Sequence, residues 1–133
     1  MHPYLPQEKL LRFCRLKGIA VTAYSNLGAG SYVPLGMAAV EESCLTESHV
    51  VEIAKKHGKS AAQIVLRWGV QRGTAVIPKT TSKERLVENF SILDFSLTQE
   101  EMDTITKLDK NRRFNDPGVF CELAFATFFP TYE

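Results

Sequence analysis

The feature that most constrains this chain is a change from a strand pattern to a helix pattern within residues 74–89, which read TAVIPKTTSKERLVEN. A short apolar run over residues 74–77 is typical of a buried parallel strand, and Pro78 ends it. The helix that follows has unpaired N–H groups and the positive end of its dipole at its N-terminus, which suits a phosphate group. Lys79 and Arg85 add positive charge to the same junction.

Two interpretations of this junction stay open on spacing alone. In (β/α)8 barrels, the loops after the seventh and eighth strands often form a phosphate site of this kind. Thr81 with Glu84 three residues later is equally a capping box, and Lys83 and Arg85 can be solvated surface charges. Both interpretations predict a strand followed by a helix, and one of them predicts a phosphate site.

Strand and helix patterns also alternate before this junction. Residues 7–17 carry an amphipathic helical pattern that Gly18 would stop, and residues 19–24 are small and branched, as in a parallel strand. A long loop over residues 26–44 comes next. A helix over residues 46–57 follows, and its first residue, a threonine, is expected to cap it.

Two further capping boxes predict helices later in the chain. Ser60 with Gln63 opens one, and Thr98 with Glu101 opens another. The resulting order of strands and helices predicts parallel strands joined by crossover helices. Residues 111–133 are aromatic and are expected to be a loop-like C-terminal tail.

Composition is that of an ordinary globular domain, and we expect a single domain over residues 1–133. Hydrophobic residues make up 44% of the chain, and 16 Lys and Arg against 15 Asp and Glu give a net charge of +1. This balance argues against a nucleic-acid surface and a polybasic membrane anchor. No apolar run approaches the roughly 18 residues of a membrane span, so we expect no membrane partner.

Cysteine and histidine spacing argues against a metal site. Cys14, Cys44 and Cys121 are widely spaced and form no Cys-x-x-Cys pair, which fits reduced thiols in a cytoplasmic protein. None of them has ligand spacing with a histidine. His2 is a candidate acid–base group, although a structural role is favoured for it.

Several motifs in a fixed order resemble the C-terminal half of the aldo-keto reductase family. They are HPYLPQEKL at residues 2–10, GIAVTAYS at 18–25, KHGKSAAQ at 56–63, Arg67 with Trp68, VIPKTTSKERLVEN at 76–89 and RFNDP at 113–117. The last of these is similar to the tail of fungal xylose reductases and related sugar reductases.

The resemblance implies the C-terminal portion of a (β/α)8 TIM barrel with two extra helices, over residues 46–57 and after Thr98. A complete barrel needs about 250 residues, and this chain has 133, so an incomplete barrel with open edges and possible self-association is expected. The catalytic Asp, Tyr, Lys and His of the family belong to its first four strands. No position in this sequence matches them, so no catalytic residue is assigned.

The resemblance assigns a nicotinamide and pyrophosphate site to the end of the strand over residues 19–24. Tyr24 matches the tyrosine that stacks on the nicotinamide ring, which suits a flat aromatic side chain. Without the resemblance, Tyr24 could equally pack on a neighbouring loop. Ser25 and Leu27 match positions that contact the pyrophosphate, whereas Ala29 stands where some members have a serine.

The residues after the strand over 74–77 would bind the adenosine end of NADPH. The resemblance assigns the 2′-phosphate to Lys79, Thr80 and Arg85, because a lysine charge and an arginine fork suit a dianion. Glu88 and Asn89 would reach the adenine amino group. NADH remains possible, because some xylose reductases accept it with these residues present.

The tail carries one substrate-side assignment. Asn115 matches an asparagine of the sugar reductases, but Gly118, Val119 and Phe120 stand where those members tend to have tryptophan. The phenylalanines of this region could line a pocket, cover the barrel bottom or form an exposed patch. They are Phe114, Phe120, Phe125, Phe128 and Phe129.

The resemblance therefore implies the NADPH-binding half of a reductase that, in complete form, reduces aldehydes or aldose sugars by hydride transfer. The chain alone is expected to be inactive, because the proton donor and its partners are missing. A second interpretation, from another class, is a catalytically inactive truncated product that binds only a nucleotide or another protein.

Overall fold

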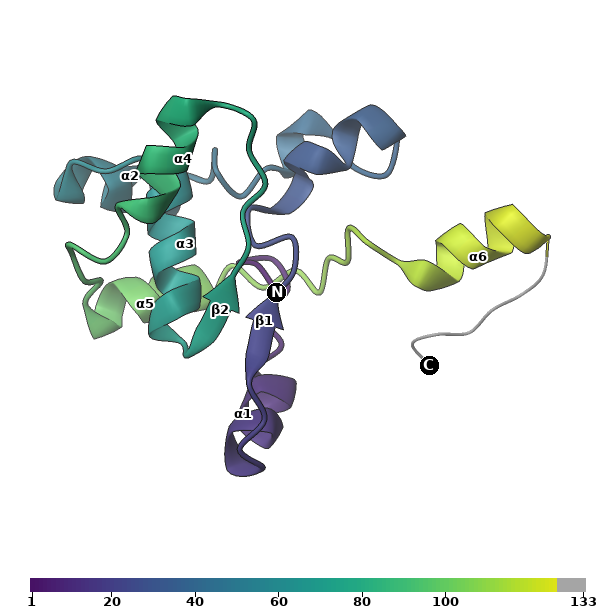
Figure 1. Cartoon of the computed structure of the whole chain (residues 1–133), viewed down its shortest axis with the longest axis horizontal. Helices are drawn as coiled ribbons and strands as arrows, with labels where there is room; N and C mark the ends of the chain where they lie inside the picture. The colour runs from purple at the N-terminus through teal and green to yellow at the C-terminus, as the bar shows by residue number, and fades with distance from the viewer. Residues whose placement is uncertain (127–133) are drawn as a thin grey trace.

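The computed structural model describes residues 1–126, in which two short parallel strands pair directly (Figure 1). Strand β1 is Val21–Ala23 and strand β2 is Thr74–Val76, with Val21 opposite Thr74. The predicted parallel pairing is confirmed. In the described part of the chain the sheet has no third strand, and near its start His2 and Leu5 form only an isolated antiparallel bridge.

Helices α1 and α3 form where their end signals predict them. Helix α1, Glu8–Leu16, is followed by Gly18, whose φ of 67° is the left-handed conformation that stops a helix. Helix α3, Ala61–Gln71, begins with the predicted capping box, in which Ser60 Oγ accepts from the Gln63 N–H at 3.2 Å. Helix α3 lies against β2 and carries the chain back to the sheet.

The two expected extra helices are α2, Ser48–His57, and α5, Gln99–Thr106. The capping box of α5 is confirmed, with Thr98 Oγ1 accepting from the Glu101 N–H. The cap expected for α2 is wrong, because Thr46 Oγ1 donates to the Ser43 carbonyl instead. The N-cap of α2 is Glu47, which makes no side-chain cap bond.

Helix α4, Lys83–Phe90, also begins one residue later than its predicted cap allows. Ser82 Oγ accepts from the Arg85 N–H at 3.1 Å and is the cap. Thr81 with Glu84 is therefore not the capping box, and the Glu84 carboxylate accepts from the Ser82 hydroxyl instead. Thr80, Thr81 and Ser82 are adjacent hydroxyl residues that could each cap a helix. Thr80 Oγ1 accepts from the Ser82 N–H and forms the turn before the helix, which leaves Ser82 as the N-cap.

Residues 26–44 contain three short 3₁₀ turns within the expected loop. They are η1 Gly28–Ser31, η2 Val33–Leu35 and η3 Val40–Glu42. The Arg112 guanidinium donates to both Glu42 carboxylate oxygens and to the Met37 carbonyl, which ties the loop to the start of the tail. These bonds hold the pKa of Glu42 at about 2, well below its usual value.

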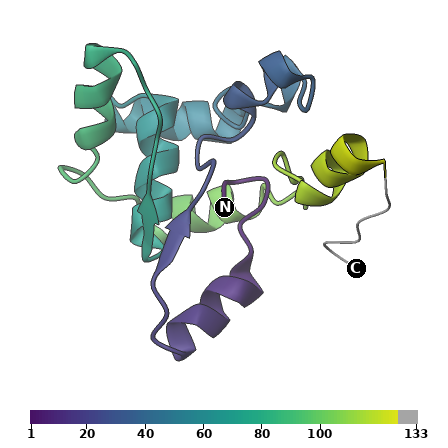
Figure 2. The ribbon, with the colours of Figure 1, turned by 45° about the vertical axis from the view of Figure 1, so that its right-hand side comes forward.

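The expectation of a loop-like tail is wrong, because helix α6 spans Pro117–Phe125. Asp116 caps it by accepting from the Gly118 N–H, and Pro117 occupies its first position. Helix α6 projects away from the other elements (Figure 2). The Phe125 side chain is exposed. Phe128 and Phe129 lie outside the described residues.

The core lies between α2, α3 and α5. Trp68 is fully buried there, and its indole N–H donates to Thr106 Oγ1 at 3.1 Å. Val50, Ile64 and Ile105 are fully buried beside it. Burying one large side chain of this kind contributes about 1.5–3 kcal/mol, so this cluster holds α3 against α2 and α5.

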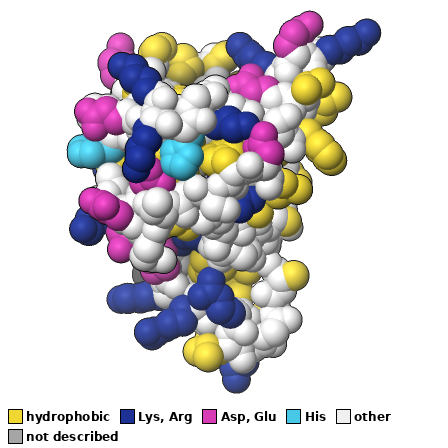
Figure 3. Space-filling model, turned by 90° about the vertical axis from the view of Figure 1, so that its left-hand side faces the viewer, with side chains coloured by type: hydrophobic (Ala, Val, Ile, Leu, Met, Phe, Trp, Pro, Cys, Tyr) yellow, Lys and Arg dark blue, Asp and Glu magenta, His cyan; other side chains and the backbone are white. Residues whose placement is uncertain are grey.

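Many charged side chains lie on the face to the left of Figure 1, where α2 and α5 lie (Figure 3). The buried Glu101 carboxylate accepts from Lys56 Nζ at 2.8 Å and lies 2.9 Å from His57 Nε2, which joins α5 to the end of α2. No helix among residues 1–126 is both long and apolar enough to cross a membrane.

Candidate functional site

A hollow of about 420 Å³ opens where β1 and β2 end. Because the strands are parallel, their C-terminal ends meet at one edge of the sheet, which is where ligands bind in barrels of this type. The hollow is lined by Tyr24, Ser25, Asn26, Leu27, Gly28, Gly30, Ser31, Tyr32, Leu45, Ile77, Pro78, Lys79 and Arg85. Five of the predicted site residues thus share one hollow, namely Tyr24, Ser25, Leu27, Lys79 and Arg85.

The turn after β1 has an unusual backbone. Ser25 has a φ of 53°, a left-handed backbone conformation that residues other than glycine rarely adopt. Its hydroxyl lies 2.5 Å from the Tyr32 hydroxyl, and burial raises the pKa of Tyr32. The Tyr24 side chain is 59% exposed, so its ring is open to a ligand.

Gly28 closes this turn. Its φ is 77°, and an added Cβ would lie 3.1 Å from Cys44 Sγ. Cys44 is fully buried, and its thiol donates to the Leu27 carbonyl. A larger side chain at residue 28 would be strained at this φ and would press on the buried Cys44 thiol, so glycine suits this wall of the hollow.

The opposite wall of the hollow is cationic. Lys79 and Arg85 are exposed, and neither side chain has an ion-pair partner within residues 1–126. They flank the N-terminus of α4, although the Arg85 N–H is already bonded to Ser82. The Ser82 hydroxyl lowers the pKa of Glu84, which keeps a negative charge beside the same helix end. A phosphate would therefore be held mainly by the two side chains.

Three predicted adenosine-side residues do not line this hollow. Thr80 Oγ1 accepts from the Ser82 N–H at 3.1 Å, so its hydroxyl stabilises the turn. The Glu88 carbonyl accepts from the buried Gln63 side chain. Asn89 lines a separate groove, as Pro78 also does. Their assignment to the 2′-phosphate and adenine stays a prediction.

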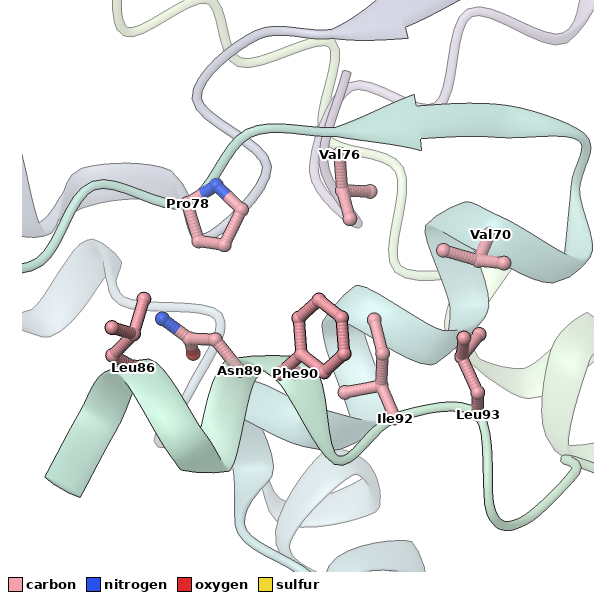
Figure 4. Close-up of a pocket in the computed structure, with 8 residues that line it drawn as sticks. All are labelled: Val70, Val76, Pro78, Leu86, Asn89, Phe90, Ile92 and Leu93. Atoms are coloured by element: carbon pink, nitrogen blue, oxygen red, sulfur yellow. The ribbon is translucent and has the colours of Figure 1, made fainter. Parts of the chain in front are cut away.

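That separate groove lies between α4 and the end of β2 with the residues that follow it (Figure 4). It was not predicted from the sequence. It has a volume of about 370 Å³ and is lined by Val70, Val76, Pro78, Leu86, Asn89, Phe90, Ile92 and Leu93. Phe90 is 82% exposed and Leu86 is 61% exposed. Large apolar side chains that are this open usually meet another surface.

Asn115 lies on a neighbouring hollow of about 310 Å³ that also includes Tyr24 and Ser25. The substrate-side prediction and the nicotinamide-side prediction therefore share two residues. Phe114 also lines this hollow, as one of the suggested pocket phenylalanines. The Phe120 side chain lies outside the described part of the structure.

His2 lies on the wall of the same hollow, packed on Phe114 with the ring centroids 4.8 Å apart. Burial lowers the pKa of His2 to about 3, with further lowering by the N-terminal ammonium and by Arg112 and Arg113. A neutral, packed imidazole fits the structural role favoured for it.

Two polar residues of the main hollow, Asn26 and Tyr32, were not predicted from the sequence. Asn26 is buried, and Tyr32 is 7% exposed and stacks on Phe114 at 6.0 Å. Both stand in a glycine-containing loop, where sequence alone offers no periodicity to assign a buried side. Within residues 1–126, no group of three or more His, Cys, Asp or Glu side chains is placed to hold a metal ion.

The donor set of the main hollow fits a phosphorylated nucleotide. Lys79 and Arg85, which have no ion-pair partner among residues 1–126, line one wall. The Ser25 hydroxyl and the exposed Tyr24 ring line another. Cations recognise phosphate and aromatic rings stack on flat heterocycles.

Comparison with known proteins finds one family model and several reductases that are similar to this chain. The family model described as "Aldo/keto reductase family" matches residues 1–110. The NAD(P)H-dependent D-xylose reductase I,II of Candida tropicalis is 48% identical over 118 residues, which cover 87% of this chain and 36% of that protein. The NAD(P)H-dependent D-xylose reductase of Scheffersomyces stipitis is 49% identical over 118 residues, covering 87% and 37%.

A relative with different cofactor wording is the NADH-dependent D-xylose reductase of Candida parapsilosis, which is 43% identical over 124 residues, covering 92% of this chain and 38% of that protein. The matched stretch thus spans only 36% to 38% of the length of these relatives.

Proposed function

Because the chain belongs to the aldo/keto reductase family, whose fold is a (β/α)8 barrel, we propose that it is the NADPH-binding part of a reductase. In complete form this reductase would convert aldehydes or aldose sugars to alcohols by hydride transfer. The observation that carries the proposal is the shared hollow, where Tyr24 and Ser25 of one strand end face Lys79 and Arg85 of the other.

Each residue of the hollow has a distinct task in this proposal. A bound nicotinamide cofactor supplies the hydride. Tyr24 would hold one face of the nicotinamide ring, while Ser25 and the backbone at Leu27 would bind the pyrophosphate. Lys79 and Arg85 would bind the 2′-phosphate, which supports a preference for NADPH over NADH.

The same residues leave room for NADH. One similar relative is named as NADH-dependent and others as NAD(P)H-dependent. Loss of the 2′-phosphate would leave the Tyr24 and Ser25 side of the hollow unchanged, so NADH would bind more weakly through the remaining contacts.

The hollow that contains Asn115 would bind the substrate with its carbonyl group. It shares Tyr24 and Ser25 with the main hollow, which we call the cofactor hollow from here on, so cofactor and substrate would meet at the turn after β1. The amide of Asn115 can both donate and accept a hydrogen bond, which suits the hydroxyl groups of an aldose.

Reductase activity should require more than these residues. Within the family resemblance, the proton-donating tyrosine and its partners belong to earlier strands, and no position in the 133 residues matches them. General-acid catalysis commonly contributes a factor of about 10² to 10⁴. We therefore expect no turnover by the chain alone.

The test is oxidation of NADPH by this chain with xylose or glyceraldehyde, alone and mixed with a separately produced N-terminal part of a xylose reductase. Recovery of turnover only in the mixture supports the proposal. Turnover by the chain alone contradicts it, and NADPH binding measured in parallel shows whether the hollow works without catalysis.

The apolar groove favours a second proposal, that this chain docks on a polypeptide carrying the remaining strands of the barrel. Strand β2 pairs only with β1 in the described structure, so its other edge has no strand partner there. Exposed Leu86 and Phe90 line the groove next to Val76 of this strand (Figure 4). In the matched relatives, well over half of the length lies outside the matched stretch. Without that partner, the chain is expected to self-associate.

Size-exclusion chromatography with light scattering tests this second proposal. The chain alone should form oligomers that Phe90→Asp reduces. A purely monomeric chain that also fails to bind the N-terminal part would contradict the proposal.

A further inference from the structure

Asn26 is a buried polar residue in the turn that follows β1. It lines the main hollow together with Ser25 and Leu27, yet its side chain is only 3% exposed. Nδ2 donates to the Met1 carbonyl at 3.3 Å. Oδ1 is buried and has no hydrogen-bond partner within residues 1–126.

The Asn26 side chain occupies space that a glycine leaves free. Gly69 lies inside helix α3, where alanine is intrinsically more favourable. A Cβ added to Gly69 would lie 2.9 Å from Asn26 Nδ2 and 3.0 Å from Val76 Cγ1. The Thr74 hydroxyl donates to the Gly69 carbonyl at 2.8 Å and fixes this part of the helix against β2.

Two hydrogen bonds join the turn to the start of the chain. The Met1 amino group donates to the Tyr24 carbonyl at 2.9 Å, and Asn26 Nδ2 donates to the Met1 carbonyl. Between them, Ser25 has a φ of 53°. A left-handed residue other than glycine persists only where its surroundings impose that conformation.

We propose that Asn26 is a positioning residue of the cofactor hollow. Its side-chain amide packs against the backbone of Gly69 and so fixes the turn. In this position of the turn, the Tyr24 ring and the Ser25 hydroxyl are oriented toward the ligand. This inference rests on the proposed NADPH function. It adds a residue that acts through its neighbours, because its own side chain is almost wholly buried in the wall of the hollow.

A purely structural role for Asn26 makes a different prediction. A buried acceptor without a partner lowers stability, so an asparagine that served the core alone would be poorly suited to this place. Replacing it should therefore change ligand binding more than it changes the thermal unfolding midpoint.

The experiment compares two ligands on this chain by isothermal titration calorimetry. NADPH would contact both Tyr24 and Ser25 as well as the cations. Adenosine 2′,5′-bisphosphate lacks the nicotinamide and should depend mainly on Lys79 and Arg85. Thermal unfolding of each variant is measured in parallel.

The variants are Asn26→Ala, Gly69→Ala and the double variant. Each single change should raise the Kd for NADPH roughly tenfold through lost preorganisation, and change the Kd for the bisphosphate about twofold or less. Alanine at residue 26 removes the amide that the Gly69→Ala methyl group would strike. The double variant should therefore bind NADPH no more weakly than Gly69→Ala alone.

Three results would overturn the inference. They are an unchanged Kd for NADPH in both single variants, equal weakening of both ligands, and full additivity of the two changes. If the unmodified chain binds neither ligand, the proposed function itself fails. If it binds both and the variants do not separate them, only the role of Asn26 fails.

Discussion

The hydroxyl oxygens of Ser25 and Tyr32 lie 2.5 Å apart across the turn that forms one wall of the cofactor hollow. The pair joins the left-handed residue after β1 to the loop that follows it, so the orientation of the Ser25 hydroxyl depends on Tyr32.

Tyr32→Phe should therefore weaken both folding and nucleotide binding. Loss of one hydrogen bond should lower the free energy of unfolding by about 1 kcal/mol. The Kd for NADPH should rise several-fold, because Ser25 would be free to rotate. Urea unfolding and calorimetric titration measure the two effects, and unchanged values in both would contradict the importance of the pair.

Arg85→Ala should weaken NADPH far more than NADH. Loss of a hydrogen bond to a charged group costs about 1.5–3 kcal/mol, which is roughly ten- to a hundredfold in Kd. Lys83→Ala is the matched control, because Lys83 is an exposed cation on the same helix that does not line the hollow. Equal weakening of both cofactors by Arg85→Ala would remove the argument for discrimination.

Glu101→Gln should lower the free energy of unfolding by about 2 kcal/mol near neutral pH, because the buried carboxylate loses its charge toward Lys56 and His57. Burial alone would raise the pKa of Glu101, but bonds from Lys56, the Thr98 N–H and His57 outweigh it and lower the pKa to about 2. A lowered folded-state pKa means that this stabilisation is complete above the ordinary carboxyl pKa and is lost as the pH falls toward 2.

The difference in stability between Glu101→Gln and the unmodified chain should therefore shrink as the pH falls from about 5 toward 2. Glu100→Gln is the control, since Glu100 is exposed on the same helix, and its effect should stay within about 0.5 kcal/mol. A Glu101 effect that is small or independent of pH would contradict the buried network.

Thiol labelling should distinguish the cysteines. Cys44 is fully buried, and burial raises its pKa to about 12, so it should not react in the folded chain. Cys121 is partly exposed and should react first. Mass spectrometry after labelling near pH 8 identifies the modified residues. Rapid labelling of Cys44 before unfolding would show that the loop over residues 26–44 does not pack as described.

How much of this structure follows from sequence depends on how local each signal is. The capping boxes at Ser60 and Thr98 were predictable because each is completed within four residues. The starts of α2 and α4 were misplaced because neighbouring hydroxyl groups compete and tertiary contacts decide between them. Helix α6 was missed although Asp116 and Pro117 are a recognisable helix start.

The site divides in the same way. Residues next to a strand end, such as Tyr24 and Lys79, could be placed because parallel strands bring their ends together. The groove that Asn89 lines could not be predicted, because the direction in which a helix faces depends on packing, here through Gln63 bonded to the Glu88 carbonyl. The burial of Asn26 against Gly69 depends on two segments far apart in sequence, and no local pattern indicates it.

Calorimetric titration of the unmodified chain with adenosine 2′,5′-bisphosphate and with adenosine 5′-monophosphate tests the central claim most directly. The two ligands differ only by the 2′-phosphate that Lys79 and Arg85 are proposed to bind. The account predicts that the bisphosphate binds at least roughly tenfold more tightly, in keeping with a charge-assisted contact. Equal affinity for the two ligands, or no binding of either, would contradict it.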